Sequence, residues 1–495
     1  MEHTLAHPDA TLTVPRPAWD RARLVPRMVH IGCGAFHRAH QAMYLHQLLA
    51  SSDCDWGICA VNLMSESGRR LVEQLREQEM LYSVTESGES GQTQTLIGAI
   101  KEALHPALDG CDAILRALAR PETAIVSLTV TEKGYCVNPA SGQLDRHHPL
   151  IQHDLSDPGR PKSAVGFIVE ALRLRRDAGL PGFTVLACDN LRENGHVARA
   201  AVLGLAQLRD AALATWIEAQ VTFPCTMVDR IVPAVTEETQ QEIAALLGVN
   251  DPCGVVCEPF SQWVIEDNFA QGRPAWDRVG AQFVDDVAPF ELMKLRMLNG
   301  SHSFLAWLGY LAGYTTVAET MQQPVWRRAV RALMLNEQRP TLRMPEGVDL
   351  DAYAEALVSR FSNPSLRHRT AQIASDGSQK LPQRMLDSIR YHLQHGGDYR
   401  CLALGVAGWM RYVLGKDERG EPYEVVDPLY VTLQQINQQH PEGRDRVTAL
   451  LGLRAVFSDD LPAHKAFVET LQAAYAHLCQ HGAEAAVAAL FPEEP

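Results

Sequence analysis

The segment MVHIGCGAFHRAHQ, residues 28–41, joins an apolar strand to a glycine turn and then to a helix. Gly32 permits a tight turn. Gly34 lets the backbone approach a phosphate at a helix N-terminus, where amide groups and the helix dipole favour anions. His37 stands where the dinucleotide-binding pattern G-x-G-x-x-G has its third glycine. The segment favours a dinucleotide-binding turn, with an ordinary strand-to-helix turn as the alternative.

Strand and helix signals alternate on both sides of this turn. Runs rich in apolar and β-branched residues predict strands at 27–31, 56–62, 123–130 and 183–188. The segments between and after them predict helices at 39–50, 68–80, 161–179 and 194–209. Alternating strands and helices with short connections are typical of a doubly wound parallel α/β sheet.

The second half of the chain changes character near Pro289. Strand signals fade, and helical runs dominate at 289–311, 325–336, 352–361, 381–394 and 463–478. The sequence therefore predicts an α/β domain over residues 1–286 and an all-helical domain over residues 287–495.

The composition excludes several classes of protein. The 495 residues carry a formal net charge of −14, which disfavours a nucleic-acid-binding protein because neutralising phosphates needs a basic surface. No run of 18 apolar residues is present, and the N-terminal segment lacks the pattern of a signal peptide. The 11 cysteines are scattered, which favours reduced thiols. We expect a cytoplasmic protein without nucleic-acid or membrane partners, as a monomer or a small homo-oligomer.

Two pairs of potential metal ligands occur in the sequence. His37 and His40 are three apart and could share a helix face, and Cys253 and Cys257 are four apart. A structural zinc needs a second pair at suitable spacing, which neither pair has. We expect no metal.

The end of the second predicted strand bears on the choice of cofactor. The strand ends at Asn62 and lacks the acidic residue that usually holds the ribose of NAD, although Asn62 could also hydrogen-bond a ribose. Arg69 and Arg70 could instead bind the 2′-phosphate of NADP, or lie on the surface of a helix. Arg38 could contact phosphate or lie on a solvated helix face. NAD is the expected cofactor, and NADP stays open.

The segment PFELMKLRMLNGSHSFLAWLGYL, residues 289–311, places three polar side chains in an apolar helix. On a regular α-helix, His302 lies about 80° and Asn299 about 140° from Lys294 around the axis, so all three are on one side. A buried lysine with a lowered pKa can act as a general base. Asn299 can donate its amide to an alkoxide oxygen, His302 can bind a substrate hydroxyl, and Gly300 would leave space for a ligand. The alternative is that Lys294 reaches solvent and His302 is a core histidine.

Several blocks resemble one family when they are taken together. They are the 289–311 helix with GAFHRAHQA (34–42), TVTEKGY (129–135), CDNLRENG (188–195) and FPCTMVDRIVP (223–233). In this order they resemble the polyol-specific long-chain dehydrogenases, the mannitol dehydrogenase family, over about residues 27 to 415. The resemblance implies a Rossmann-like N-terminal domain, a mainly helical C-terminal domain, NAD(P) and no zinc.

The resemblance also implies roles for individual residues. Lys294 would be the general base, Asn190 and Asn299 would form an oxyanion hole, and His302 would orient the substrate. Asp229 would contact the substrate, with an ion pair to Arg230 as the alternative.

Further residues would contact the cofactor. Ala35 and Phe36 would belong to the cofactor turn with Gly32 and Gly34. Glu132 and Lys133, just past a strand end, would line the cofactor crevice or form a surface pair.

The substrate class depends on a basic stretch at residues 361–384, which contains Arg367, His368, Arg369, Lys380 and Arg384. Arginine can bind a carboxylate with two parallel hydrogen bonds. Within the family, the sequence is most similar to enzymes acting on sugar acids. This implies reversible NAD-dependent oxidation of D-mannonate to D-fructuronate. Mannitol, arabinitol or another sugar acid is the alternative substrate, and a catalytically silent NAD(H)-binding sensor is the alternative class.

Overall fold

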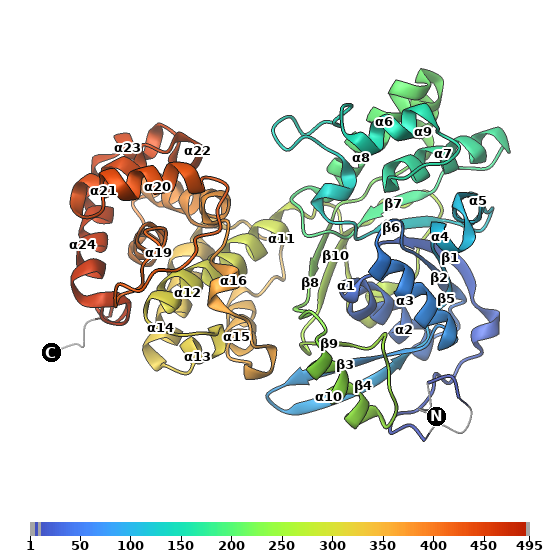
Figure 1. The fold of residues 1–495 in the computed structure, drawn as a ribbon, viewed down its shortest axis with the longest axis horizontal. Helices are drawn as coiled ribbons and strands as arrows, with labels where there is room; N and C mark the ends of the chain where they lie inside the picture. Colours follow the sequence, from blue (N-terminus) through green and yellow to red (C-terminus); the bar gives the residue numbers. More distant parts are fainter. Residues whose placement is uncertain (1–4, 8–10, 492–495) are drawn as a thin grey trace. The chain divides into compact units, whose positions relative to one another are not determined.

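Figure 1 shows the protein as a computed structural model, which describes residues 5–7 and 11–491. The chain divides into two compact units, Met1–Ala288 and Pro289–Pro495. Residues 1–4 and 8–10, part of the segment in which we expect no signal peptide, lie outside the described residues.

A five-stranded parallel sheet forms the centre of the first unit. Its strands are β1 (Val25–Ile31), β2 (Trp56–Val61), β5 (Ile100–Leu104), β6 (Ile125–Leu128) and β7 (Thr184–Ala187). They run in the order β5-β2-β1-β6-β7. Because the chain proceeds in opposite directions from β1, the sheet is doubly wound, with its switch point between β1 and β6. The predicted fold class is confirmed.

Both faces of this sheet are buried under helices (Figure 1). Successive strand residues enter different apolar clusters, since Val29 packs with α5, α7 and α8 whereas Met28 packs with α2 and α3. Burial on both faces explains the near-continuous apolar strands of the sequence. The helices of this unit are α1 (Ala35–Ala39), α2 (Gln41–Ser51), α3 (Glu66–Glu77), α4 (Pro106–Asp109), α5 (Cys111–Ala119), α6 (Pro149–Ser156), α7 (Ala164–Asp177), α8 (Asn194–Arg209), α9 (Ala211–Gln220) and α10 (Glu237–Leu247), with 3₁₀ turns η1 (Arg21–Arg23), η2 (Glu132–Tyr135) and η3 (Trp276–Val279).

Two further three-stranded sheets belong to the first unit. One contains β4 (Gly91–Ile97), β3 (Tyr82–Gly88) and β9 (Val255–Cys257), and the other contains β11 (Gln282–Val284), β10 (Gln262–Glu266) and β8 (Thr226–Asp229). The sequence analysis predicts none of these strands, because they are short or carry polar residues on both faces, as β4 does.

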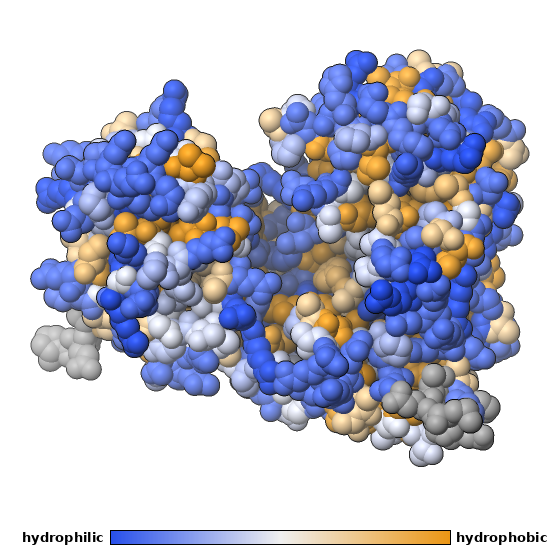
Figure 2. All heavy atoms as spheres, viewed as in Figure 1, coloured by the Kyte–Doolittle hydropathy of each residue, from blue (hydrophilic) through white to orange (hydrophobic). Residues whose placement is uncertain are grey.

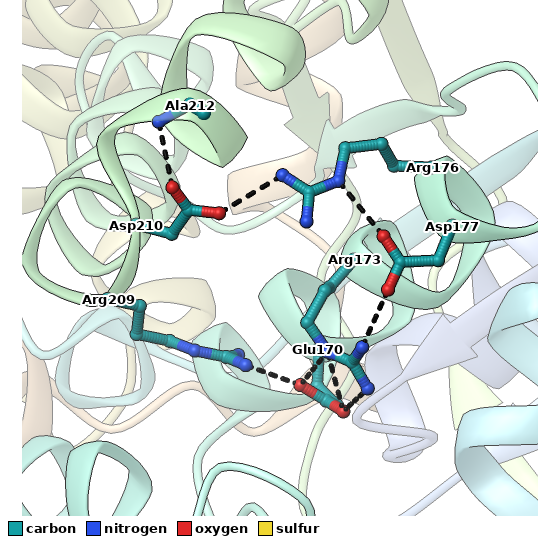
Figure 3. Close-up of polar contacts among 7 residues, drawn as sticks. All are labelled: Glu170, Arg173, Arg176, Asp177, Arg209, Asp210 and Ala212. Carbon is teal, nitrogen blue, oxygen red and sulfur yellow. Dashed lines mark hydrogen bonds and ion pairs between the residues drawn. The ribbon is translucent and has the colours of Figure 1, made fainter.

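Ion pairs connect α7 with α8 and with the start of α9 (Figure 3). The carboxylate of Glu170 is buried, and it accepts hydrogen bonds from Arg173 at 2.7 Å and from Arg209 at 2.6 Å. Arg176 donates to Asp210, the N-cap of α9, at 3.1 Å. These contacts fix α8, which begins shortly after the end of β7.

The second unit is mainly helical, as predicted (Figure 1). α12 is buried along almost its whole length and packs against α19. The elements are α11 (Ala288–Met293), η4 (Lys294–Asn299), α12 (Gly300–Leu311), α13 (Val317–Met321), α14 (Pro324–Ala332), η5 (Leu333–Gln338), η6 (Arg339–Thr341), α15 (Leu350–Phe361), η7 (Pro364–Leu366), α16 (Thr370–Ile373), α17 (Gly377–Leu381), η8 (Pro382–Leu386), α18 (Asp387–His395), α19 (Arg400–Tyr412), α20 (Tyr430–Gln439), α21 (Gly443–Leu451), α22 (Arg454–Phe457), α23 (Asp460–Ala463) and α24 (Lys465–Ala488).

The helix expected at 289–311 contains a π turn, η4, between α11 and α12. The Gly300 amide donates to the Leu295 carbonyl, five residues earlier. The angles between Lys294, Asn299 and His302 that were predicted for a regular α-helix are therefore wrong. Because a π turn takes up one extra residue, Lys294 and His302 are separated by the equivalent of seven α-helical positions, or about 20° around the axis. The turn thus brings them closer to the same side than the sequence indicates.

The surface of each unit is mainly hydrophilic in the view of Figure 2. The large apolar side chains that are exposed among the described residues are Met64, Leu208, Leu246, Val426, Tyr430 and Val431. Within the described ranges, no helix has the length and apolar character needed to cross a membrane.

Candidate active site

The glycine turn lies at the carboxyl end of β1, next to the end of β6. Gly32 has a φ of +96°, and a Cβ at this position would stand 2.1 Å from the carbonyl oxygen of Thr129. The Gly32 amide donates to the carbonyl of Val61, at the end of β2. Only glycine fits here, because both the backbone conformation and the close approach of Thr129 exclude a side chain.

Gly34 has a different environment. It is the N-cap of α1, with a φ of −95°, and a Cβ there would meet only the Gly32 carbonyl oxygen, at 4.0 Å. The protein thus leaves this side of the backbone open, beside the first residues of α1, Ala35 and Phe36. An open backbone next to helical amides fits the approach of a dinucleotide pyrophosphate.

His37 occupies the position of the third glycine and is stacked on His30 of β1, with ring centroids 3.4 Å apart. Burial lowers the pKa of His30 to about 3 and that of His37 well below its ordinary value, so both rings are neutral. His30 is held by the hydroxyls of Ser127, at 2.7 Å, and Thr129, at 2.8 Å. The histidine pair thus fills the space between the strand and the helix that follows the turn.

His40 does not share a continuous helix with His37, as the sequence suggested, because the chain leaves helical geometry at His40 between α1 and α2. Nor does Arg38 lie on a solvated face. It is buried, and its guanidinium donates to the carbonyls of Cys253 and Cys33. Arg38 therefore fixes the turn to the chain before β9, and its contact with phosphate stays a prediction.

The candidates for ribose recognition follow β2. The Asn62 amide lies 3.4 Å from the carbonyls of Cys33 and Gly68. Arg69 is paired with Glu66 and Glu73 on the surface of α3. These ion pairs occupy the guanidinium of Arg69, which favours the alternative of a surface arginine over recognition of a 2′-phosphate.

The ends of β6 and β7 are tied together by Asp189, which the sequence analysis does not single out. Its buried carboxylate accepts hydrogen bonds from the Tyr135 hydroxyl at 2.5 Å and from the Thr131 amide at 2.8 Å. Burial raises the pKa of Asp189. The exposed side chains of Glu132 and Lys133, on η2, and of Asn190 are thereby placed at the carboxyl edge of the sheet.

Asp229 ends β8 and is buried. The neighbouring Arg230 forms an ion pair with Glu86 and donates to the carbonyls of Glu258 and Ala39. The guanidinium of Arg230 therefore fixes β8 to its neighbours.

In the second unit, η4 and α12 carry the predicted catalytic side chains. Lys294 and His302 are buried, with 9% and 6% of their surface exposed, so Lys294 does not simply extend into solvent. Asn299 is half-buried, and its backbone carbonyl lies 3.4 Å from the Arg384 guanidinium. Gly300 does not leave space for a ligand as expected. A Cβ there would stand 2.9 Å from the Gln338 amide and 3.1 Å from the Arg384 carbonyl oxygen.

His302 lies near three basic residues, Arg360, Lys380 and Arg384, which we call the cationic cluster. Its ring centroid is 4.7 Å from that of Phe361 and 5.1 Å from that of His368. Burial lowers the pKa of His302 well below its ordinary value, and His368 and the cationic cluster lower it further. The imidazole is therefore neutral, and the charge of this site lies on its neighbours.

The basic residues of the 361–384 stretch differ in their burial. Lys380 donates to the Ile373 carbonyl at 2.8 Å, and burial lowers its pKa to about 8. Arg384 donates to the Ser303 hydroxyl at 3.0 Å, and burial lowers its pKa to about 10. Arg367 and Arg369 are exposed. Within the described residues, no group of three or more His, Cys, Asp or Glu side chains is placed to hold a metal ion.

Two family models match this chain, one in each of its two units. A model of the mannitol dehydrogenase Rossmann domain matches residues 26–278, and a model of the mannitol dehydrogenase C-terminal domain matches residues 286–479. The chain belongs to the mannitol dehydrogenase family. The predicted family is confirmed.

Relatives in the mannitol dehydrogenase family span the whole chain. D-mannonate oxidoreductase of Escherichia coli (strain K12) is 66% identical over 482 residues, covering 97% of this chain and 99% of its own. The ternary complex of Pseudomonas fluorescens mannitol 2-dehydrogenase with NAD and D-mannitol has a TM-score of 0.81 and 40% identity, covering 97% of this chain and 96% of that one. A substrate-free D-sorbitol dehydrogenase has a TM-score of 0.90 and 36% identity, covering 95% and 96%.

One member of the cationic cluster, Arg360, was not predicted from the sequence. It is buried with Leu357 and Phe361 on the inner face of α15. The signal was present, since Arg360 follows Leu357 by three positions and so belongs to the apolar face of the helix. A charged residue on an apolar helix face indicates a buried charge with a function or a partner.

Proposed function

We propose that the protein is an NAD-dependent oxidoreductase that interconverts D-mannonate and D-fructuronate. The observation that carries this proposal is the 66% identity, over 97% of the chain, to a protein named D-mannonate oxidoreductase. NAD follows from the open backbone at Gly34 and from the NAD complex of the related mannitol 2-dehydrogenase. The substrate is a small sugar acid, and no metal takes part.

We further propose a division of labour between the two units. Residues 1–286 bind the cofactor through Gly32, Gly34, Ala35 and Phe36 at the carboxyl edge of the parallel sheet. Residues 287–495 bind the substrate. The contacts of Asn62, Glu132 and Lys133 with the cofactor stay predictions, as does the role of Asn190.

In the oxidation of D-mannonate, the neutral amine of Lys294 accepts the proton of the reacting hydroxyl while a carbon–oxygen double bond forms. Bound NAD supplies the acceptor for the hydride that leaves the same carbon. The Asn299 amide donates a hydrogen bond to the oxygen as negative charge develops on it. Neutral His302 orients the substrate through its hydroxyl groups. In the reverse direction, protonated Lys294 returns the proton.

The cationic cluster supports a carboxylate substrate. Arg360, Lys380 and Arg384 lie close enough to His302 to lower its pKa, and the carboxylates of Asp376 and Asp427 raise the pKa of Lys380 against the effect of burial. A carboxylate entering this group would be favoured by charge and by paired hydrogen bonds. His368 and Lys380 are therefore proposed to bind the substrate. The contacts of Asp229 and Arg367 with the substrate remain predictions from the family resemblance.

The test is a spectrophotometric assay of NADH oxidation on one preparation of the full chain, with D-fructuronate, D-tagaturonate and D-fructose compared. Strong turnover with D-fructuronate alone is expected. Preference for D-fructose or D-tagaturonate would keep the reaction type but contradict the substrate. Absence of turnover with all three, despite NADH binding, would contradict the proposal and favour a sensor that binds NAD(H).

A further inference from the structure

Three π turns meet at Gly300. They are η4, which carries Lys294 and Asn299, η5 (Leu333–Gln338) and η8 (Pro382–Leu386). A Cβ on Gly300 would contact the Gln338 amide of η5 and the Arg384 carbonyl of η8. Since π turns interrupt α-helices at functional sites more often than elsewhere, three at one point indicate that this junction serves the chemistry carried by η4.

Gln338 is the side chain at the centre of the junction. It is completely buried, and its amide nitrogen donates to the Arg384 carbonyl at 2.9 Å. Its amide oxygen accepts from the hydroxyl of Ser388, in α18, at 2.5 Å. The side chain therefore joins η8 and α18 to η5 at the position closest to Gly300.

Arg384 connects Gln338 to the proposed catalytic helix. Its backbone is held by Gln338, and its guanidinium donates to the Ser303 hydroxyl at 3.0 Å and to the Asn299 carbonyl at 3.4 Å. A second connection joins η5 to η4 through Thr341 of η6. The Thr341 hydroxyl donates to the Gln338 carbonyl and accepts from Arg296 of η4.

We propose that Gln338 is a positioning residue, which sets the direction of the Lys294 and Asn299 side chains by holding Arg384 and η4 in place. Gln338 acts through Arg384 and the packing at Gly300 and touches no reacting group itself. This inference rests on the proposed function, because it assigns to Lys294 and Asn299 the roles given above.

The neighbouring Glu337 provides a matched control. It is also buried in η5, but its carboxylate accepts hydrogen bonds from the amides of Cys401 and Leu402, at the start of α19. Glu337 therefore supports a different helix from the same turn. Glu337→Gln tests what a change of similar burial does to the protein when the contact with Arg384 is kept.

The experiment compares the wild type, Gln338→Leu and Glu337→Gln by steady-state kinetics with D-fructuronate across pH, together with NADH binding and thermal unfolding. For Gln338→Leu we expect kcat to fall at least about tenfold, the dissociation constant for NADH to change less than about twofold, and the pH midpoint of kcat to move. A tenfold change corresponds to about 1.4 kcal/mol. Glu337→Gln should keep the wild-type kcat and pH midpoint even if its melting temperature falls.

Two outcomes would overturn the proposal. One is a Gln338→Leu enzyme with unchanged kcat and pH profile, which would make the residue purely structural. The other is an equal loss of kcat in Glu337→Gln. If Gln338→Leu does not fold, Gln338→Glu keeps the length and the acceptor for Ser388 but loses the donor to Arg384, and the same criteria apply. A wild-type protein without turnover would instead contradict the proposed function.

Discussion

The imidazole of His368 meets that of His302 edge to face, with ring centroids 5.1 Å apart. Burial lowers the pKa of both rings. The Nδ1 atom of His368 is buried and has no hydrogen-bond partner among the described residues. Two imidazoles with lowered pKa values thus lie beside Arg360, Lys380 and Arg384, which carry the charge of the site. We propose that the two rings exchange hydrogen bonds with substrate hydroxyls.

The first prediction concerns the general base. Lys294→Ala should lower kcat by orders of magnitude, because positioned proton transfer contributes about 10²–10⁴-fold to a rate. NADH binding, measured by fluorescence titration, should stay within about twofold of the wild type, since the glycine turn is unchanged. Turnover close to that of the wild type would contradict the role given to Lys294.

Replacing Gly32 should lower the stability of the protein, whereas replacing Gly34 should weaken NADH binding. Gly32→Ala should destabilise the protein by at least about 2 kcal/mol in urea unfolding, because of its positive φ and the approach of Thr129. Gly34→Ala should unfold like the wild type but bind NADH at least about tenfold more weakly, a loss of about 1.4 kcal/mol. Wild-type affinity in Gly34→Ala would mean that the pyrophosphate does not approach this residue.

The charge of Lys380 predicts a pH effect on substrate binding. Its pKa is lowered to about 8, chiefly by burial, so the ammonium is lost as the pH rises through that value. The KM for D-fructuronate should therefore rise above about pH 8, whereas the dissociation constant for NADH, which binds the first unit, should not. Lys380→Met should show a high KM for D-fructuronate at every pH. A KM for D-fructuronate that stays constant across pH 8 in the wild type would remove Lys380 from carboxylate recognition.

Acid should destabilise the first unit through His46. The Gly98 amide donates to its Nδ1 atom at 3.1 Å, and burial lowers its pKa to about 4. An unfolded histidine has a pKa of about 6.5, so between these values the unfolded chain binds a proton that the folded chain does not. Stability is therefore lost as the pH falls through this window, by up to about 1.4 kcal/mol per pH unit.

His46→Gln should reduce that slope, because glutamine offers Gly98 an acceptor and does not titrate. The free energy of unfolding in urea, measured between about pH 4 and pH 7, gives the slope directly. His196→Gln is the control, since the His196 side chain is 68% exposed. Equal slopes in His46→Gln and the wild type would show that folding does not lower the pKa of His46.

The ion pairs of Figure 3 give a stability prediction. Glu170, with a side chain 4% exposed, is shared by Arg173 and by Arg209, which is 12% exposed. Glu170→Ala should cost about 3 kcal/mol, because a largely buried arginine loses its partner. Asp177→Ala is the control and should cost less than about 1 kcal/mol, since Asp177 is 47% exposed. If thermal unfolding shows similar losses of stability in Glu170→Ala and Asp177→Ala, the greater contribution assigned to the buried Glu170 would be contradicted.

The fold could be predicted where burial leaves a simple pattern in the sequence. The strand at Val25–Ile31 is buried without a break over its last four residues, and the helix at Asn194–Arg209 buries side chains at helical spacing. The strand at Gly91–Ile97 leaves no such pattern, because its first three residues are exposed and polar residues lie on both of its faces.

The candidate site was predictable in its chemistry but not in its geometry. Lys294 and His302 stand out as polar residues in an apolar helix. The π turn between them does not, because residue types with a 3.6 period do not reveal one extra residue in a turn. Arg38 looks like a surface arginine of a helix, and only the fold shows that distant carbonyl groups, such as that of Cys253, receive its hydrogen bonds.

The π turn at Lys294–Asn299 also bears on chain length. An extra residue in a regular α-helix rotates everything beyond it by about 100°, whereas a π turn absorbs that residue within a single turn and leaves both flanks in register. Such a helix can gain or lose one residue at that point in evolution and still direct its two ends to the same side. The widened turn is then an insertion kept in place by its neighbours, and aligned sequences that differ there by a one-residue gap can share the same arrangement of functional groups.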